Sequence, residues 1–230
     1  MREEPILRLA AETPNASSVS GNSENDNCKI NQMETKKPKL KTKDDSGRVV
    51  IVSGPSGVGK STICKEVAKR LNNVYLSISV TTRPKAESEV DGQDYWFISK
   101  EQFQHQVDKG LLLEHAEVFG HLYGTPEDKV EEALQAGKTV ILEIDVQGAR
   151  QIKKIYQNAV MIFILAPTQR ELAERMNHRG REDAETAEER LDGAGVEIAA
   201  AWQYYEHMVI NDDLEQAIKE AMQIIKGLKT

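Results

Sequence analysis

The fold of this chain follows from one stretch of sequence, Gly54-Pro55-Ser56-Gly57-Val58-Gly59-Lys60-Ser61, which fits the pattern G-x-x-x-x-G-K-[ST] of a phosphate-binding loop. Its glycines let backbone N–H groups turn inward and approach a polyphosphate closely, which a Cβ atom would obstruct. In such a loop Lys60 reaches the β- and γ-phosphates, and the hydroxyl of Ser61 binds Mg²⁺. The stretch therefore predicts a nucleotide site.

The residues on either side of the loop support this prediction. Before the loop, residues 48–53 are mostly β-branched and apolar, as is typical of a buried parallel strand. After it, Ile63, Val67 and Leu71 recur with the spacing of one helix face. A strand, a glycine loop and a helix N-terminus together make an anion site. This context disfavours the alternative of a glycine-rich turn that binds nothing.

The composition excludes several classes of protein. The chain carries a formal net charge of -7, which argues against nucleic-acid binding because such a surface needs a basic face. No apolar run approaches the roughly 20 residues that span a bilayer, so we expect a soluble protein with no membrane partner. The two cysteines, Cys28 and Cys64, imply no disulfide framework, which fits a reducing compartment and a cytoplasmic location.

Residues 1–47 differ in character from the rest of the chain. They are rich in polar and charged residues, so they cannot bury enough apolar surface to offset the entropy lost on ordering. They also lack the apolar core of a signal peptide. We therefore expect a disordered N-terminal extension, followed by one domain over residues 48–230.

Alternating strands and helices in this domain indicate an α/β fold with a mainly parallel sheet flanked by helices. Residues 79–137 contain several short, half-polar strands, and we interpret them as an α+β insertion beside that sheet. Within the insertion we expect a turn at Gly120-His121 and a helix that begins at Thr125-Pro126 with proline in its first position. The expected strands are residues 48–53, 77–83, 95–98, 111–119, 139–145, 160–165 and 208–210.

Two clusters of polar residues offer the groups that a reaction needs beyond the loop. A phosphate acceptor needs hydroxyls and a guanidinium, and a purine with a donor edge suits carboxylates. The first cluster consists of Ser79, Arg83, Tyr95, Glu114, Tyr123 and Thr125, with Asp145 at the end of a strand. Arginines can neutralise a phosphoryl group in transfer. The second cluster contains Arg175, Arg179, Arg181 and Arg190.

Structural roles are alternatives for several of these residues. Tyr95 and Tyr123, taken singly, have the character of core or surface aromatic residues, and arginines on a charged helix usually form a solvated face. Glu114 lies within an apolar run, where a buried carboxylate needs a partner. The five histidines have no ligand spacing, so we expect no metal site made wholly of protein groups.

From residue 48 to residue 225 the chain resembles the guanylate kinase family. The matching pieces, in order, are Ser53 to Thr62, Ser79 to Arg83, Gly92-Gln93-Asp94-Tyr95, Tyr123-Gly124-Thr125, Glu143 to Gly148, Arg179-Gly180-Arg181 and Val209 to Asp213. The resemblance implies an ATP:GMP phosphotransferase of purine metabolism that forms ADP and GDP with Mg²⁺ and also accepts dGMP. It implies a P-loop kinase core, a GMP-binding subdomain over residues 79–137 and a helical lid over residues 168–195.

The resemblance also gives each site residue a role. Residues 54–62 would bind ATP, with Asn211 and Asp212 along its adenine. The GMP phosphate would be held by Ser79, Arg83, Tyr95 and Tyr123, and the guanine would be read by Glu114, Thr125 and Asp145. The residues expected to act in catalysis are Lys60, Arg83, Arg179 and Arg190.

Two positions depart from the family pattern. A second phosphate-binding arginine usually follows Arg83 by three residues, where this chain has Ala86. Lys85 can replace it in part, as a point charge without the fork of a guanidinium. Glu143 stands where the family generally has aspartate near the metal, and we keep it as a candidate Mg²⁺ ligand.

Two other functions stay open from the sequence. One is a non-catalytic guanylate-kinase-like module that binds phosphopeptides, which the intact Lys60 and Ser61 and the lid arginines disfavour. The other is a related P-loop kinase that acts on a sugar phosphate, in which Glu114 and Asp145 would have no task. The sequence gives no sign of an obligate protein partner.

Overall fold

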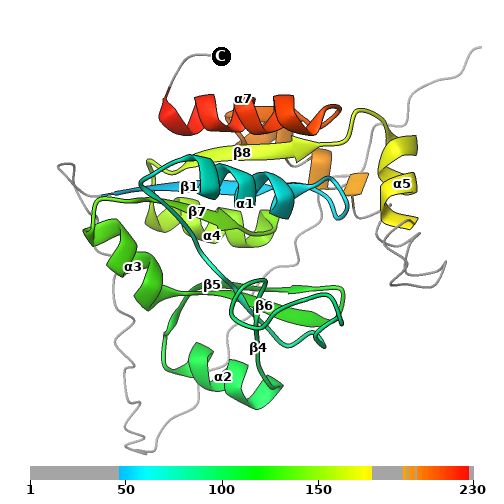
Figure 1. The fold of residues 1–230 in the computed structure, drawn as a ribbon. Helices are drawn as coiled ribbons and strands as arrows, with labels where there is room; N and C mark the ends of the chain where they lie inside the picture. Colours follow the sequence, from blue (N-terminus) through cyan, green and yellow to red (C-terminus); the bar gives the residue numbers. More distant parts are fainter. Residues whose placement is uncertain (1–46, 178–193, 196, 200, 228–230) are drawn as a thin grey trace, which may run out of the picture. The chain divides into compact units, whose positions relative to one another are not determined.

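The structure, a computed structural model, describes residues 47–177, 194–195, 197–199 and 201–227 (Figure 1). The expected disorder of residues 1–47 lies outside these ranges except at Gly47. Among the helices of the described residues, none is long and apolar enough to cross a membrane.

A five-stranded parallel sheet forms the centre of the domain. Its strands are β1 (Arg48–Ser53), β2 (Val74–Leu76), β7 (Thr139–Glu143), β8 (Val160–Leu165) and β9 (His207–Ile210). Their order is β2-β7-β1-β8-β9, and every neighbouring pair is parallel. The central strand β1 places Val50 opposite Ile141 of β7 and Val160 of β8. The mainly parallel sheet predicted from the sequence is thus confirmed.

Helices cover both faces of this sheet (Figure 1). They are α1 (Lys60–Arg70), α3 (Glu127–Gln135), α4 (Val146–Ile155) and α7 (Leu214–Lys226). Side chains of a strand point alternately to its two faces. On one face Val50 and Val52 of β1 pack with α1 and α7. On the other face Val49 and Ile51 pack with α3 and α4. Burial on both sides explains why β1 is so apolar.

A second sheet of four strands forms from the insertion. Its strands are β3 (Val80–Thr81), β4 (Trp96–Phe97), β5 (Leu112–Val118) and β6 (His121–Pro126). Their order is β4-β3-β6-β5, with β3 and β4 parallel and the other pairs antiparallel. Helix α2 (Lys100–Asp108) packs against it through Phe103, whose ring meets that of His115 edge-on at 6.3 Å between centroids.

The single strand expected over residues 77–83 is reduced to β3, and β2, which lies just before this range, was not expected. Strand β2 ends at Leu76 in the large sheet, and β3 covers only Val80–Thr81 in the small sheet. Residues 77–79 therefore cross from one sheet to the other. This crossing places Ser79, whose side chain is buried, between the two sheets.

Two further expectations about local structure are wrong. The turn expected at Gly120-His121 forms at Phe119 and Gly120, but residues 121–126 form strand β6, so Pro126 is the N-cap of α3 instead of the first residue of a helix that begins at Thr125-Pro126. The segment lacks an alternating apolar pattern, so its strand depends on pairing with β5. Asp145 lies beyond β7 and caps α4, because its Oδ1 accepts the N–H of Gly148 at 2.9 Å.

Candidate active site

The phosphate-binding loop connects β1 to α1 at the carboxyl edge of the large sheet. Gly54, Gly57 and Gly59 have φ angles of 146°, 85° and 94°, which residues with a side chain rarely adopt. Lys60 is the first residue of α1, and its Nζ donates to the carbonyl oxygens of Gly54 at 2.6 Å and Pro55 at 2.8 Å. The loop thus closes around its own lysine, which keeps a cation at the centre of the expected phosphate site.

A buried asparagine at the end of β9 supports the loop. Asn211 is 6% exposed, and its Nδ2 donates to the carbonyl oxygen of Val58 at 2.8 Å. A Cβ atom on Gly59 would lie 2.5 Å from the same nitrogen, so this approach requires glycine. Arg175 of α5 (Gln169–Asn177) donates to the backbone carbonyl of Asn211 at 2.9 Å. The contact of Asn211 and Asp212 with adenine stays a prediction.

Ser61 and Glu143, the two candidate Mg²⁺ ligands, lie in direct contact. The hydroxyl of Ser61 donates to Oε1 of Glu143 at 2.6 Å. Parallel pairing of β1 and β7 brings both residues to the same edge of the sheet. A hydroxyl and a carboxylate suit Mg²⁺, which kinases bind through one or two such groups and the substrate phosphates. The described residues contain no group of three or more His, Cys, Asp or Glu that would bind a metal by itself.

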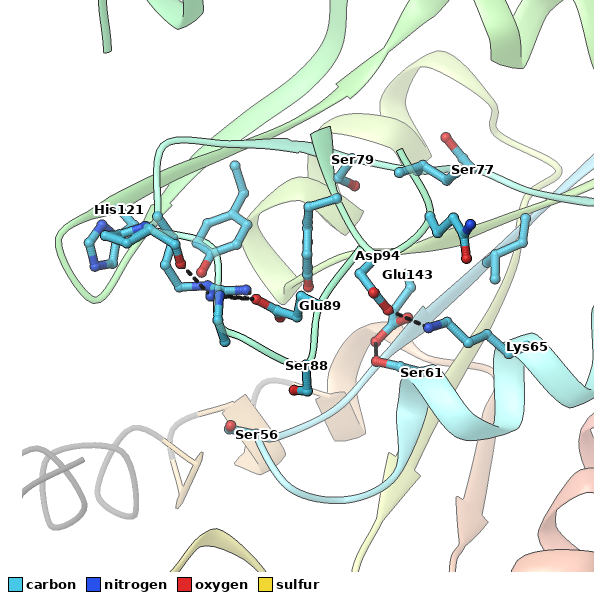
Figure 2. A pocket seen from close by; sticks show the side chains of 18 of the residues that line it. Ser56, Ser61, Lys65, Ser77, Ser79, Ser88, Glu89, Asp94, His121 and Glu143 are labelled. Carbon is cyan, nitrogen blue, oxygen red and sulfur yellow. Dashed lines mark hydrogen bonds and ion pairs between the residues drawn. The ribbon is translucent and has the colours of Figure 1, made fainter. Parts of the chain in front are cut away.

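A cleft of about 860 Å³ runs from the loop to the small sheet (Figure 2). Ser56 and Ser61 of the loop region line it together with Ser79 and Glu89. Figure 2 shows Ser56 and Ser61 on the loop and the helix that follows it, and Ser79 and Glu89 on segments of the insertion. The cleft therefore joins the donor end of the expected site to the residues expected to bind an acceptor phosphate.

Arg83 supplies the guanidinium of this cleft. Its Nη1 donates to Oε2 of Glu89 at 3.0 Å and its Nη2 to Oε1 at 2.8 Å, a forked ion pair. The Cζ atom also lies 5.5 Å from the ring centroid of Tyr95 and 5.6 Å from that of Phe97. Burial alone would lower the pKa of Arg83, but its hydrogen bonds and charge contacts, above all with Glu89, raise it. The cation is therefore fixed in place.

The position of the missing second arginine faces the same cleft. Ala86 lines it, and the backbone N–H of Ala86 donates to Oε2 of Glu89 at 2.9 Å. The Nζ of Lys85 donates to the backbone carbonyl of Glu89 at 3.0 Å, so this ammonium is held by Glu89. Among the described residues that line the cleft, Arg83 is the single arginine. Sequence reasoning gave Glu89 no role, although an acid six residues after Arg83 was visible.

Glu114 and Asp145 form an acidic end of the site. Glu114 of β5 is 4% exposed and accepts a hydrogen bond from Oγ1 of Thr125 on β6 at 2.6 Å. The expectation that this carboxylate has a partner is confirmed. Burial raises the pKa of Glu114 to about 7. The hydrogen bond from Thr125 lowers this pKa, and the charge of Asp145 raises it. Glu114 therefore titrates near neutral pH.

A smaller pocket of about 190 Å³ connects the loop to these carboxylates. Lys60 lines it together with Glu114 and Asp145, so the expected donor and acceptor groups meet in one cavity. Tyr95 and Tyr123 also line it, with their rings edge to face at 5.8 Å between centroids. Burial raises the pKa of Tyr95, so its hydroxyl keeps its proton and can donate to an anion.

One acidic residue of this pocket was not predicted from the sequence. Glu197 lines the pocket from the segment that follows the expected lid. Burial raises its pKa to about 7, the charge of Lys60 lowers it, and that of Asp145 raises it. Acids are frequent throughout this part of the chain, so no pattern distinguishes Glu197.

The two expected lid arginines, Arg179 and Arg190, lie outside the described residues. Their roles stay predictions. The described beginning of the expected lid is α5, where the backbone N–H of Glu171 donates to the hydroxyl of Thr168 at 3.1 Å.

Comparison with known proteins yields one family. The model of that family, guanylate kinase, matches residues 46–228. The guanylate kinase of Carboxydothermus hydrogenoformans is 45% identical over 183 residues, which cover 80% of this chain and 89% of the relative. That of Thermotoga maritima is 44% identical over 181 residues, 79% of this chain and 87% of the relative. The crystal structure of guanylate kinase from Anaplasma phagocytophilum matches with a TM-score of 0.67 at 32% identity, covering 79% of this chain and 86% of that one.

Proposed function

We propose, because this chain belongs to the guanylate kinase family, that it transfers the γ-phosphoryl group of ATP to GMP and releases ADP and GDP. The chain is accordingly a nucleoside monophosphate kinase, a transferase of purine nucleotide metabolism and GMP recycling. In this proposal the same site accepts dGMP. One observation carries the choice of acceptor: Lys60 lines a single pocket with Glu114 and Asp145.

The donor half of the proposal rests on residues 54–62. Their backbone N–H groups would hold the ATP phosphates, and Lys60, which is bonded to loop carbonyls, would turn to the β- and γ-phosphates. Ser61 and Glu143 would hold Mg²⁺, which would supply positive charge to neutralise the phosphates of ATP. The contact between these two side chains supports this assignment.

The acceptor half rests on the small sheet and the N-terminus of α4. Arg83, held by Glu89, would attract the GMP phosphate with its guanidinium charge, assisted by the hydroxyls of Ser79, Tyr95 and Tyr123. Guanine presents an N1–H and an exocyclic amine, which suit the carboxylate acceptors Glu114 and Asp145, with Thr125 beside them. Arg179 and Arg190 would then neutralise the phosphoryl group in transfer.

The proposed GMP-binding subdomain covers residues 79–137 and the proposed lid covers residues 168–195. Helix α3 at the end of the subdomain buries Val130 and Leu134 in the core of the large sheet, so it anchors the insertion. We place the enzyme in the cytoplasm, where ATP and GMP are both available. Its proposed partners are these small molecules, and neither nucleic acid, nor membrane, nor an obligate protein partner enters the proposal.

Release of ADP from ATP, measured with four acceptors, tests this function. We expect turnover with GMP and dGMP, and none above background with AMP or ribose 1,5-bisphosphate. Turnover with ribose 1,5-bisphosphate alone would instead assign a sugar phosphate kinase. Binding of ATP and GMP without turnover would favour the non-catalytic module.

Restoring the missing arginine should strengthen GMP binding. In Ala86→Arg the new guanidinium faces the cleft beside Arg83, and a second charged contact to the phosphate is worth about 1.5–3 kcal/mol. The KM for GMP should fall by about tenfold or more, with the KM for ATP unchanged. Ala86→Gln adds similar bulk without charge and serves as the control. Unchanged GMP affinity and turnover in Ala86→Arg would contradict this account of the phosphate site.

The affinity for GMP is expected to fall as the pH drops below about 7. Guanine donors need ionised Glu114, and the pKa of this carboxyl is raised to about 7, so at lower pH GMP must displace a proton. The KM for GMP should therefore be about tenfold higher at pH 6 than at pH 8. Steady-state kinetics across this range measures the effect.

The phosphate of GMP also titrates, with a second pKa of about 6, so this pH profile needs a control. Glu114→Gln removes the carboxyl and leaves the phosphate. Its KM for GMP should be higher at every pH and should lose most of the pH dependence. An equally steep profile in Glu114→Gln would assign the dependence to the phosphate or to Glu197.

A further inference from the structure

We propose that Gly148 is a positioning residue that sets the recognition of guanine, by leaving room for the carboxylate of Glu114. The inference rests on the proposed function and adds to it a residue that does not itself line the pocket. Gly148 lies in the first turn of α4, three residues after Asp145, which caps this helix. The role follows from the close approach of two elements that are distant in sequence.

The first observation is a close approach of Glu114 to the backbone of α4. A Cβ atom built on Gly148 would lie 2.3 Å from Oε2 of Glu114 and 2.9 Å from its Cδ. Real Cβ atoms do not approach other atoms this closely. The carboxylate of Glu114 thus occupies the space that any side chain at position 148 would need.

The second observation is that the same residue contacts the second base-reading carboxylate. The backbone N–H of Gly148 donates to Oδ1 of Asp145 at 2.9 Å, and the missing Cβ would lie 3.2 Å from that oxygen. Both carboxylates therefore meet at residue 148, at the N-terminus of a helix. The partial positive charge of this terminus favours two neighbouring anions that would otherwise repel each other.

Glu114 has little freedom to avoid an added methyl group. Its side chain is buried, and its Oε1 accepts a hydrogen bond from the hydroxyl of Thr125 at 2.6 Å, while its Oε2 is the oxygen nearest to Gly148. The carboxylate is therefore held between β6 and α4, with its remaining face toward the pocket that Lys60 also lines. A displacement of Glu114 by even a fraction of an ångström changes the acceptors that guanine meets.

The fold should tolerate a methyl group here, because the collision is with the end of a side chain. The atoms nearest to the added Cβ all belong to the Glu114 and Asp145 side chains, and none belongs to the backbone. Gly148 lies within α4, where alanine is a better helix former than glycine. Gly148→Ala therefore tests the position of Glu114 separately from folding.

We expect Gly148→Ala to raise the KM for GMP by about tenfold or more, with the KM for ATP within about twofold of the wild type. Calorimetry should give the same loss in the Kd for GMP. The affinity for inosine monophosphate, which lacks the exocyclic amine, should fall less than the affinity for GMP. The preference of the enzyme for GMP over inosine monophosphate should therefore shrink. A merely structural defect would weaken the binding of both nucleotides equally and leave this preference unchanged.

Lys154→Ala is the control, because it changes an exposed residue of the same helix in its last turn, whereas Gln147 bonds to the backbone of β5. It should leave both KM values unchanged. A second variant tests the contact itself: in Gly148→Ala with Glu114→Asp the shorter acid avoids the methyl group. Glu114→Asp should then raise the KM for GMP much less in the Gly148→Ala background than it does in the wild type.

The outcomes distinguish this inference from the function on which it rests. If the wild type does not phosphorylate GMP, the proposed function fails. If the wild type does so and Gly148→Ala has wild-type KM values for GMP, or if the two substitutions are additive, the inference alone is overturned.

Discussion

Replacing Lys60 by alanine is expected to lower kcat for GDP formation by about 10³-fold, which corresponds to about 4 kcal/mol of transition-state stabilisation. The Nζ of Lys60 lies at the centre of the loop, bonded to the carbonyl oxygens of Gly54 and Pro55. Negative charge spreads over the oxygens of the transferring phosphoryl group, and an ammonium already fixed there stabilises it without reorganisation. Single-turnover kinetics at saturating ATP and GMP measures the loss.

A second lysine of the same helix gives the control for this experiment. Lys69 is 71% exposed and paired with Glu66, so Lys69→Ala should keep kcat within about twofold of the wild type. Urea unfolding of both variants checks the fold. If folded Lys60→Ala keeps more than about a tenth of the wild-type kcat, the loop does not have the role of donor site.

Replacing Arg83 by alanine is expected to lower kcat/KM for GMP by about 10²–10³-fold, on the scale of removing one member of a desolvated ion pair. Two features make the loss large. Position 86 is alanine, so no second arginine of the described cleft compensates. The substitution also leaves the Glu89 carboxylate without the fork that neutralises it, facing an anionic substrate. ATP binding, measured by calorimetry, should be unchanged.

The contribution of Glu89 can be separated from that of the lost contact. In Arg83→Ala with Glu89→Gln the repelling charge is absent, and about tenfold of the lost kcat/KM should return. Arg70→Ala is the control, because Arg70 is paired at the surface of α1 with Glu215 and Glu66. It should change kcat/KM by less than about twofold. A loss below about threefold in Arg83→Ala would mean that this arginine serves only the structure.

The donor half of the site could be predicted because its determinants are contiguous. The apolar strand, the glycines and Lys60 follow one another within β1 and the start of α1, so local pattern and local geometry coincide. The contact of Ser61 with Glu143 also follows from a general rule, since parallel strands bring their carboxyl ends to one edge.

The acceptor half could be predicted only in part, because it depends on pairing between distant segments. The need of Glu114 for a partner was visible, but the partner is set by the register of β5 and β6, which places Glu114 opposite Thr125. Strand β6 itself has no alternating pattern, and its last two residues were expected to begin a helix. The approach of Glu114 to Gly148 arises from the packing of α4 on β5, which no local pattern encodes.

In the proposed reaction, this site transfers the γ-phosphoryl group of ATP to GMP. Incubation of the enzyme with Mg²⁺, ATP and GMP, followed by chromatographic separation of all nucleotides, tests it most directly. We predict that GDP and ADP form in equal amounts, and that neither forms when GMP is replaced by AMP. Formation of ADP without GDP, or equal use of AMP, would contradict the account.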